Sequence, residues 1–198
     1  MKKLLLVVAC VAIVGSASAQ KFSYGVKAGM NASNITKLDG EFVDADTKLK
    51  GGLYAGIFGE YTFSEYLGVQ AEIMYSAQGC SFDVSGVDYL RMNLDYINVP
   101  ILAKIYVLPQ LSVDLGPQFG FLLSAKVKAK GDGDTAKTDI KDGMKSFDLS
   151  VPLGLSYKFD FGLEINARYA LGLTKIWDDS DAPKSKNGVI QFGVGYRF

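Results

Sequence analysis

Histidine is absent from this chain of 198 residues, and tryptophan occurs only once. Without histidine, the sequence lacks the usual base of Ser-His and Cys-His nucleophilic sites and the commonest ligand of transition metals. It also lacks a phosphate-binding glycine loop and a dinucleotide-binding motif. Serine or carboxylate chemistry would remain open to an enzyme, but no spacing of these residues indicates it. The sequence therefore predicts a protein that is not an enzyme and that holds no cofactor or metal.

Cysteine and proline are also scarce, with two and five residues, whereas glycine occurs 22 times and aromatic residues make up 12% of the chain. This composition favours strands and tight turns and argues against disorder. Cys10 lies in an N-terminal apolar run, so Cys80 is the only cysteine left if that run is removed. We then expect no intramolecular disulfide and interpret Cys80 as small apolar filler near a strand end.

The N-terminus has the three parts of a secretory signal peptide. Lys2 and Lys3 precede an apolar run at residues 4–14, and small residues follow as far as Ala19. The run is well short of the roughly 20 residues that a membrane-spanning helix needs. We expect residues 1–19 to be a cleaved signal peptide and residues 20–198 to form one mature domain. Lipid attachment at Cys10 is the weaker alternative, because this cysteine lies inside the apolar run.

Neither sign of charge dominates, because 21 Lys and Arg residues face 21 Asp and Glu residues. Removal of Lys2 and Lys3 leaves 19 basic residues and a net charge of about −2. This balance gives no support to a nucleic-acid partner.

The mature sequence has no long apolar run, and its recurring period is two. Every odd-numbered residue from Leu163 to Leu173 is apolar or aromatic, while Glu164, Asn166 and Arg168 fall on the opposite face. A strand places alternate side chains on opposite faces, so this segment is expected to be a strand with one apolar face. Similar segments lie at residues 22–30, 51–63, 67–79, 91–107, 111–123, 145–159, 162–174 and 187–198.

Eight strands joined in sequence order predict an all-β fold, an antiparallel up-and-down barrel. Two local faults are expected within it. The apolar phase shifts near residues 95–97, where we expect a bulge in the fourth strand, and Pro152 predicts an irregularity in the sixth. The connections alternate in length: short ones lie at residues 64–66, 108–110 and 160–161, and long ones at residues 31–50, 80–90, 124–144 and 175–186.

Alternation alone does not tell whether the apolar face lies outside, as in a membrane barrel, or inside, as in a soluble lipocalin-like barrel with a ligand cavity. Long connections at one end only, and aromatic residues near the strand ends, are typical of an outer-membrane barrel. Mixed charges on the polar faces can pair within a narrow interior without forming a pore. We therefore expect an interior charge network formed by Lys104, Arg168, Glu72, Asp114, Asp148 and Glu164.

The last strand supports the same orientation. Apolar residues alternate with polar residues and glycines up to Tyr196 and Phe198, the final residue given. This pattern resembles the terminal strand that marks outer-membrane barrels for insertion, so Tyr196 and Phe198 are the candidate insertion signal. They imply the barrel-insertion machinery as a partner.

Two acidic groups lie in the long connections. Calcium can bind to external carboxylates, but the spacing of these groups does not match an EF-hand. We interpret them as solvated loop residues. Trp177, beside the second group, is expected at the membrane interface rather than as an anchor for a partner. The two groups are Asp132, Asp134 and Asp139, and Asp178, Asp179 and Asp181.

The run DYINVPILAKIY at residues 95–106, with GVKAGMN at residues 25–31 and Gly116-Pro117, resembles the PorT-like outer-membrane β-barrel family. The resemblance spans essentially the mature chain. It implies an eight-stranded barrel, and one namesake is associated with a protein secretion system, a narrow role that does not transfer on these motifs. In this reading Gly25 and Gly29 leave room inside a curved wall, and Lys104 is an interior charge seeking a carboxylate.

These observations predict a monomeric, non-catalytic barrel in the outer membrane of a Gram-negative-type bacterium. Its partners would be outer-membrane lipid, the insertion machinery and envelope or secretion-system proteins. Its external loops would serve envelope structure, adhesion or assembly with membrane partners. A transport or small-ligand-binding barrel, and a soluble periplasmic lipocalin-like binder, are the alternatives.

Overall fold

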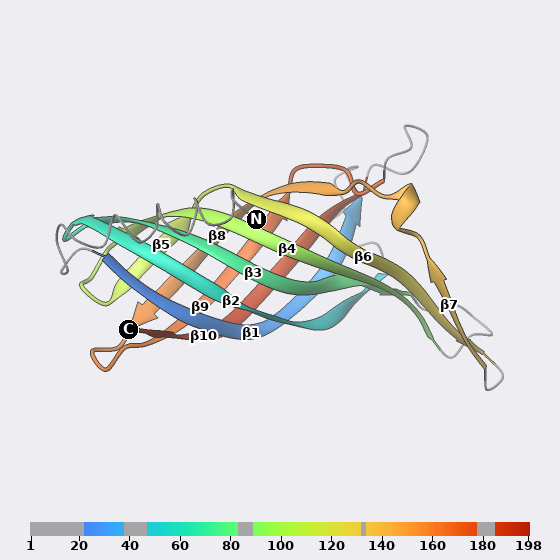
Figure 1. The fold of residues 1–198 in the computed structure, drawn as a ribbon, viewed down its shortest axis with the longest axis horizontal. Helices are drawn as coiled ribbons and strands as arrows, with labels where there is room; N and C mark the ends of the chain where they lie inside the picture. Colours follow the sequence, from blue (N-terminus) through green and yellow to red (C-terminus); the bar gives the residue numbers. More distant parts are fainter. Residues whose placement is uncertain (1–21, 38–46, 83–88, 132–133, 178–184) are drawn as a thin grey trace, which may run out of the picture.

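A computed structural model describes residues 22–37, 47–82, 89–131, 134–177 and 185–198 (Figure 1). The expected signal peptide lies outside these residues and stays a prediction. No helix among the described residues is long and apolar enough to cross a membrane. The elements are β1 (Phe22–Lys37), β2 (Thr47–Ser64), β3 (Leu67–Phe82), β4 (Tyr89–Tyr106), β5 (Leu111–Leu115), β6 (Gln118–Gly131), β7 (Asp134–Asp139), the 3-10 helix η2 (Lys141–Gly143), β8 (Phe147–Lys158), β9 (Leu163–Gly172) and β10 (Ser185–Arg197).

The strands form a closed antiparallel ring. β1 pairs with β2 on one side and with β10 on the other, from Gly25 opposite Arg197 to Lys37 opposite Ser185. β5 and β6 are two parts of one barrel strand, because both lie between β4 and β8 and are separated only by Gly116 and Pro117. β7 pairs with β6 and extends the sheet beyond the ring. The predicted eight-stranded up-and-down barrel is confirmed.

The outward face of the wall is apolar. In β4, Ile101 and Ile105 are exposed, whereas Lys104 between them is buried. The same alternation exposes large apolar side chains on the other barrel strands, including Leu53 at 65%, Phe192 at 59% and Leu153 at 55%. Such a surface suits hydrocarbon and not water. The soluble lipocalin-like alternative, which needs the apolar face inside, is therefore wrong.

The inward face changes from polar to apolar along the barrel, which corrects the prediction for β4. The register of β4 with β3 is constant from Leu67 opposite Ile105 to Phe82 opposite Leu90, so the bulge expected at residues 95–97 is absent from β4. The extra residue is Leu123 of β6, because Ser124 pairs with Asp95 and Leu122 with Tyr96. The apolar residues of β4 appear to change phase because its inward positions are polar near the short turns, as at Lys104, and apolar toward the other end of the barrel, as at Leu94.

An apolar cluster fills the end of the barrel that is away from the short turns. The stretch 124–144 was expected to be a loop, but within it residues 124–131 complete β6, and residues 134–144 form β7 and η2 and bring Met144 into this cluster. Trp177 packs against the cluster and bridges to Met144, so its expected place at the membrane interface is wrong. The members are Ile35, Cys80, Met92, Leu94, Tyr96, Leu122, Ala125, Met144 and Ile176.

The irregularity expected at Pro152 lies in the neighbouring strand. β8 keeps a constant register with β9 through Pro152 opposite Ala170. On its other side, Leu153 pairs with Leu115 and Ser150 with Gln118, so Pro152 faces the break between β5 and β6. Proline has no amide hydrogen to donate to a neighbouring strand. The break between β5 and β6 interrupts the hydrogen-bond ladder opposite Pro152, so no ladder hydrogen bond is required of it there.

Glycines at the β1–β10 seam make room for two inward aromatic residues of β2. Tyr54 and Phe58 are almost fully buried. A Cβ atom added at Gly29 would lie 2.6 Å from Tyr54 Cε1 and 2.2 Å from the Phe192 carbonyl oxygen. Gly29, and likewise Gly25 beside Phe58, therefore cannot carry a side chain without movement of the wall or of the aromatic rings.

We predict that Gly29→Ala lowers the free energy of unfolding by about 1–3 kcal/mol, because the methyl group must displace both neighbours. Gly51→Ala is the matched control, since nothing lies within 4 Å of a Cβ atom built there. Guanidinium unfolding of the protein in lipid vesicles measures both. Equal unfolding midpoints for the two variants would show that the seam is not packed as described.

Candidate functional site

The interior of the barrel holds a cluster of buried ion pairs centred on Glu72 of β3. Lys27 Nζ, from β1, lies 2.7 Å from Glu72 Oε1. Arg168, from β9, donates two hydrogen bonds of 3.0 Å to the two carboxylate oxygens of Glu72. Gln70 donates a further hydrogen bond to the same carboxylate. Glu72 thus holds two cations from different strands, and Arg168 meets it with the bidentate geometry that guanidinium groups favour.

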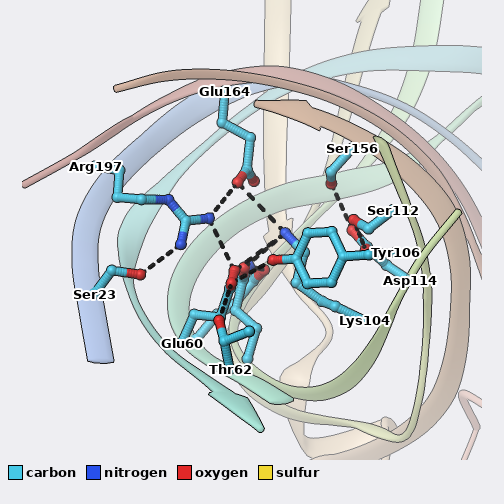
Figure 2. A network of polar contacts seen from close by, with 12 residues as sticks. Ser23, Glu60, Thr62, Lys104, Tyr106, Ser112, Asp114, Ser156, Glu164 and Arg197 are labelled. Carbon is cyan, nitrogen blue, oxygen red and sulfur yellow. Dashed lines mark hydrogen bonds and ion pairs between the residues drawn. The ribbon is translucent and has the colours of Figure 1, made fainter. Parts of the chain in front are cut away.

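A second cluster, drawn in Figure 2, is linked to the first through Gln70, which accepts a hydrogen bond from Lys104 Nζ and donates one to Glu72. Lys104 Nζ lies 3.4 Å from both Glu60 Oε2 and Glu164 Oε2. Arg197 Nη2 lies 2.8 Å from the same two oxygens. The Tyr106 hydroxyl also donates a hydrogen bond to Glu60. Figure 2 shows these side chains converging on one point inside the ring, so β2, β4, β9 and β10 are connected through their charges.

The remaining predicted carboxylates have hydroxyl partners. Asp114 accepts hydrogen bonds from Ser112 and Ser156, and it lies directly opposite Lys104 in the β4–β5 pairing. Asp148 accepts a 2.8 Å hydrogen bond from Thr174 Oγ1. Of the six residues predicted from the sequence, the structure brings Lys104, Arg168, Glu72 and Glu164 into ion pairs, places Asp114 beside them and leaves Asp148 apart.

Three further charged residues belong to the cluster but were not among the predicted six. Lys27 pairs with Glu72, and Glu60 pairs with Lys104 and Arg197. Arg197 also pairs with Glu164. The ring of Phe58 lies between two of these cations, 5.3 Å from Lys27 Nζ and 5.5 Å from Arg197 Cζ. All three lie on the polar faces of their strands, so alternation alone could have identified them.

Neutral side chains fill the barrel between the charges and the apolar cluster. Asn31 donates a 2.9 Å hydrogen bond to Ser76 and accepts a 3.0 Å one from Gln191. The Tyr54 hydroxyl donates a 3.0 Å hydrogen bond to Asn166. The described interior therefore has three successive layers, which are ion pairs, amides with hydroxyls, and the apolar cluster.

This arrangement of paired charges can stabilise the barrel and fill its interior. Within the two clusters, four cations face four carboxylates, so their charges balance, and Asp148 is a fifth buried carboxylate outside them. The cations are Lys27, Lys104, Arg168 and Arg197, and the carboxylates are Glu60, Glu72, Glu164 and Asp114. Within the described ranges, no group of three His, Cys, Asp or Glu residues is placed to hold a metal ion. Asp139, from the acidic groups of the sequence, is exposed on β7 and accepts a hydrogen bond from the Lys141 amide.

We predict that Glu72→Ala lowers the free energy of unfolding by about 3–5 kcal/mol, because it leaves Lys27 and Arg168 buried without their carboxylate. The control is Glu65→Ala, which removes one exposed carboxylate from the β2–β3 turn and should cost less than about 0.5 kcal/mol. Guanidinium unfolding in vesicles compares the two. Similar losses in both variants would contradict a structural role for the buried pairs.

Comparisons with known proteins agree with this geometry. The structure resembles Ail, the attachment invasion locus protein of Yersinia pestis, with a TM-score of 0.51 and 20% sequence identity over 90% of this chain and 99% of that chain. It also resembles Neisserial surface protein A, with a TM-score of 0.55 and 13% identity over 88% of this chain and 97% of that chain. At these identities the likeness concerns the fold. A comparison with curated proteins found no match.

The sequence itself matches a family model over most of its length. The model is described as an outer membrane protein beta-barrel domain, and it covers residues 18–178. That range includes β1 to β9, and β10 closes the same ring. The chain therefore belongs to the outer membrane protein beta-barrel family, and its apolar outer face lies in the lipid of the outer membrane.

Proposed function

We propose that the protein is a non-catalytic barrel whose packed interior makes it a rigid support, and that its external surface serves envelope structure, adhesion or assembly with membrane partners. The observation that carries this proposal is the filled interior. Ion pairs around Glu72 and Glu60, the amides around Asn31 and the apolar cluster around Tyr96 occupy successive layers. An eight-stranded barrel is just wide enough for its own side chains, so such filling leaves no continuous path.

Adhesion has support from one neighbour. The name of Ail, from Yersinia pestis, refers to attachment and invasion, and a second structure of Ail is a complex with the heparin analogue sucrose octasulfate. A role of this kind uses surface on the external side of the barrel. In this chain, β6 and β7 extend beyond the ring and supply such a surface.

We also propose a narrower family, a set of partners and an insertion signal. The motif at residues 95–106 supports a PorT-like barrel, with envelope or secretion-system proteins as the partners to examine first. For Tyr196 and Phe198 we propose recognition by the barrel-insertion machinery. Both side chains are outward and exposed, and the Phe198 ring lies 5.4 Å from that of Tyr196 and 5.7 Å from that of Tyr24. The protein would act as a monomer.

A transport function is the second candidate, and planar-bilayer recordings separate it from the first. We predict that the purified chain inserts but shows no steady single-channel conductance, because the interior layers block ions. A general porin, reconstituted in the same way, is the positive control. Reproducible conductance steps from the folded protein would contradict a packed interior and favour transport.

The display function has its own test. A variant in which residues 38–46, 83–88 and 178–184 are replaced by short Gly-Ser links keeps the strands that form the ring. Loss of adhesion or of cross-linked envelope partners in cells, with the barrel still inserted, would support display. Unchanged adhesion, permeability and partner cross-links, both in this variant and after deletion of the whole chain, would remove the basis for the proposal.

A further inference from the structure

The outward face of β6 changes from apolar to basic just beyond the membrane-facing part of the wall. Phe121 and Leu123 are outward and 48% exposed. After the extra residue in β6, the next outward side chains are Lys126 and Lys128. At a rise of about 3.4 Å per residue, these lysines lie roughly 10–17 Å along the strand from Leu123. With the roughly 35–45° tilt of barrel strands, this is about 7–14 Å of height, so the lysines lie at and just beyond the headgroup layer, which adds roughly 5–8 Å to each side of the hydrocarbon.

Neighbouring strands add to this positive charge. Lys128 lies directly opposite Arg91 of β4 and, on its other side, directly opposite Lys137 of β7. Three cations thus form a row across adjacent strands that are about 4.8 Å apart. We call Arg91, Lys126, Lys128 and Lys137 the basic face.

The side chains of this row repel one another, because Lys128 has a cation directly opposite it on each neighbouring strand. Like charges directly opposite one another destabilise a sheet. Lys126 lies opposite Asp139, but their side chains form no ion pair, and neither Lys128 nor Lys137 has one within the part of the chain that is described. An anion that contacts several members of the face would remove the repulsion.

We propose that the basic face binds the phosphate groups of lipid in the outer leaflet of the outer membrane. The face continues the surface that carries Phe121 and Leu123, so it points sideways toward neighbouring lipids rather than away from the membrane. Lipid whose acyl chains pack on these apolar side chains would place its phosphates at the level of the lysines. A soluble polyanion would instead suit a face directed along the barrel axis.

This site rests on the placement of the chain in the membrane and not on the proposed display function. In Figure 1, β6 and β7 extend at the end of the barrel opposite the C-terminus, the end at which β1 and β3 finish and which the sequence predicts to be external. The lipid would therefore be that of the external leaflet. Its binding would stabilise an extension that otherwise carries adjacent cations.

The test compares two triple variants of the full chain with equal charge. K126Q/K128Q/K137Q removes the three lysines of the face and leaves Arg91, which has other interactions. K145Q/K175Q/K186Q, the control, removes three lysines near the same end of the barrel that are not members of the basic face. Native mass spectrometry in uncharged detergent micelles gives the dissociation constant for lipopolysaccharide, for dephosphorylated lipopolysaccharide and for heparin.

We expect the first variant to bind lipopolysaccharide about 100-fold more weakly, at about fivefold per lysine, and the control variant to change by less than about fivefold. The unmodified chain should bind the dephosphorylated lipid far more weakly than the phosphorylated one, a measurement that needs no variant to fold. Equal losses in both variants, or equal affinity for both lipids, would overturn the proposal. Loss of heparin binding alone in K126Q/K128Q/K137Q would also overturn it and assign the face to a soluble polyanion.

Discussion

The hydrogen-bonded pairing of β1 with β10 is the constraint on which the rest of the structure depends. In hydrocarbon, an unpaired amide or carbonyl group costs several kcal/mol, so a sheet can cross the membrane only if its two edges pair. β1 and β10 pair from Gly25 opposite Arg197 to Lys37 opposite Ser185. Closure then decides what each side chain meets, because alternate positions must contact either lipid or the enclosed interior.

Closure with eight strands also makes the interior narrow, and the contents follow from that width. Charged side chains cannot be hydrated there as they are in water, so they must satisfy one another. Glu72 does so with Lys27 and Arg168, and Glu60 with Lys104 and Arg197. Toward the end of the barrel that is away from the short turns, the enclosed positions become apolar and form the cluster around Tyr96. The outward positions become basic over the same stretch, as at Lys126 and Lys128.

Alternation along the strands was enough to predict the barrel and most of its interior charges, since both faces of a membrane strand are constrained. Its orientation needed further signals, which were the long connections at one end, the aromatic residues near the strand ends and the pattern of the last strand. It failed where the chemistry of a face changes without a change in the backbone. The shift near residues 95–97 suggested a bulge in β4, but it marks the passage from polar to apolar interior. β7 was missed because its residues are mostly polar and exposed, and pairing partners on β6 cannot be read from such a segment. Trp177 was misplaced because its neighbour Met144 is distant in the sequence.

The most direct test of the account is cross-linking across the β1–β10 seam in the membrane. Ala28 lies directly opposite Val194, and a pair of cysteines at such positions is within the Cα separation that a disulfide allows. With Cys80 replaced by serine, A28C/V194C in the inserted protein should form an intramolecular disulfide, whereas A28C/I190C, four residues out of register, should not. Efficient cross-linking of the second pair, or of neither, would contradict the closed barrel with this register.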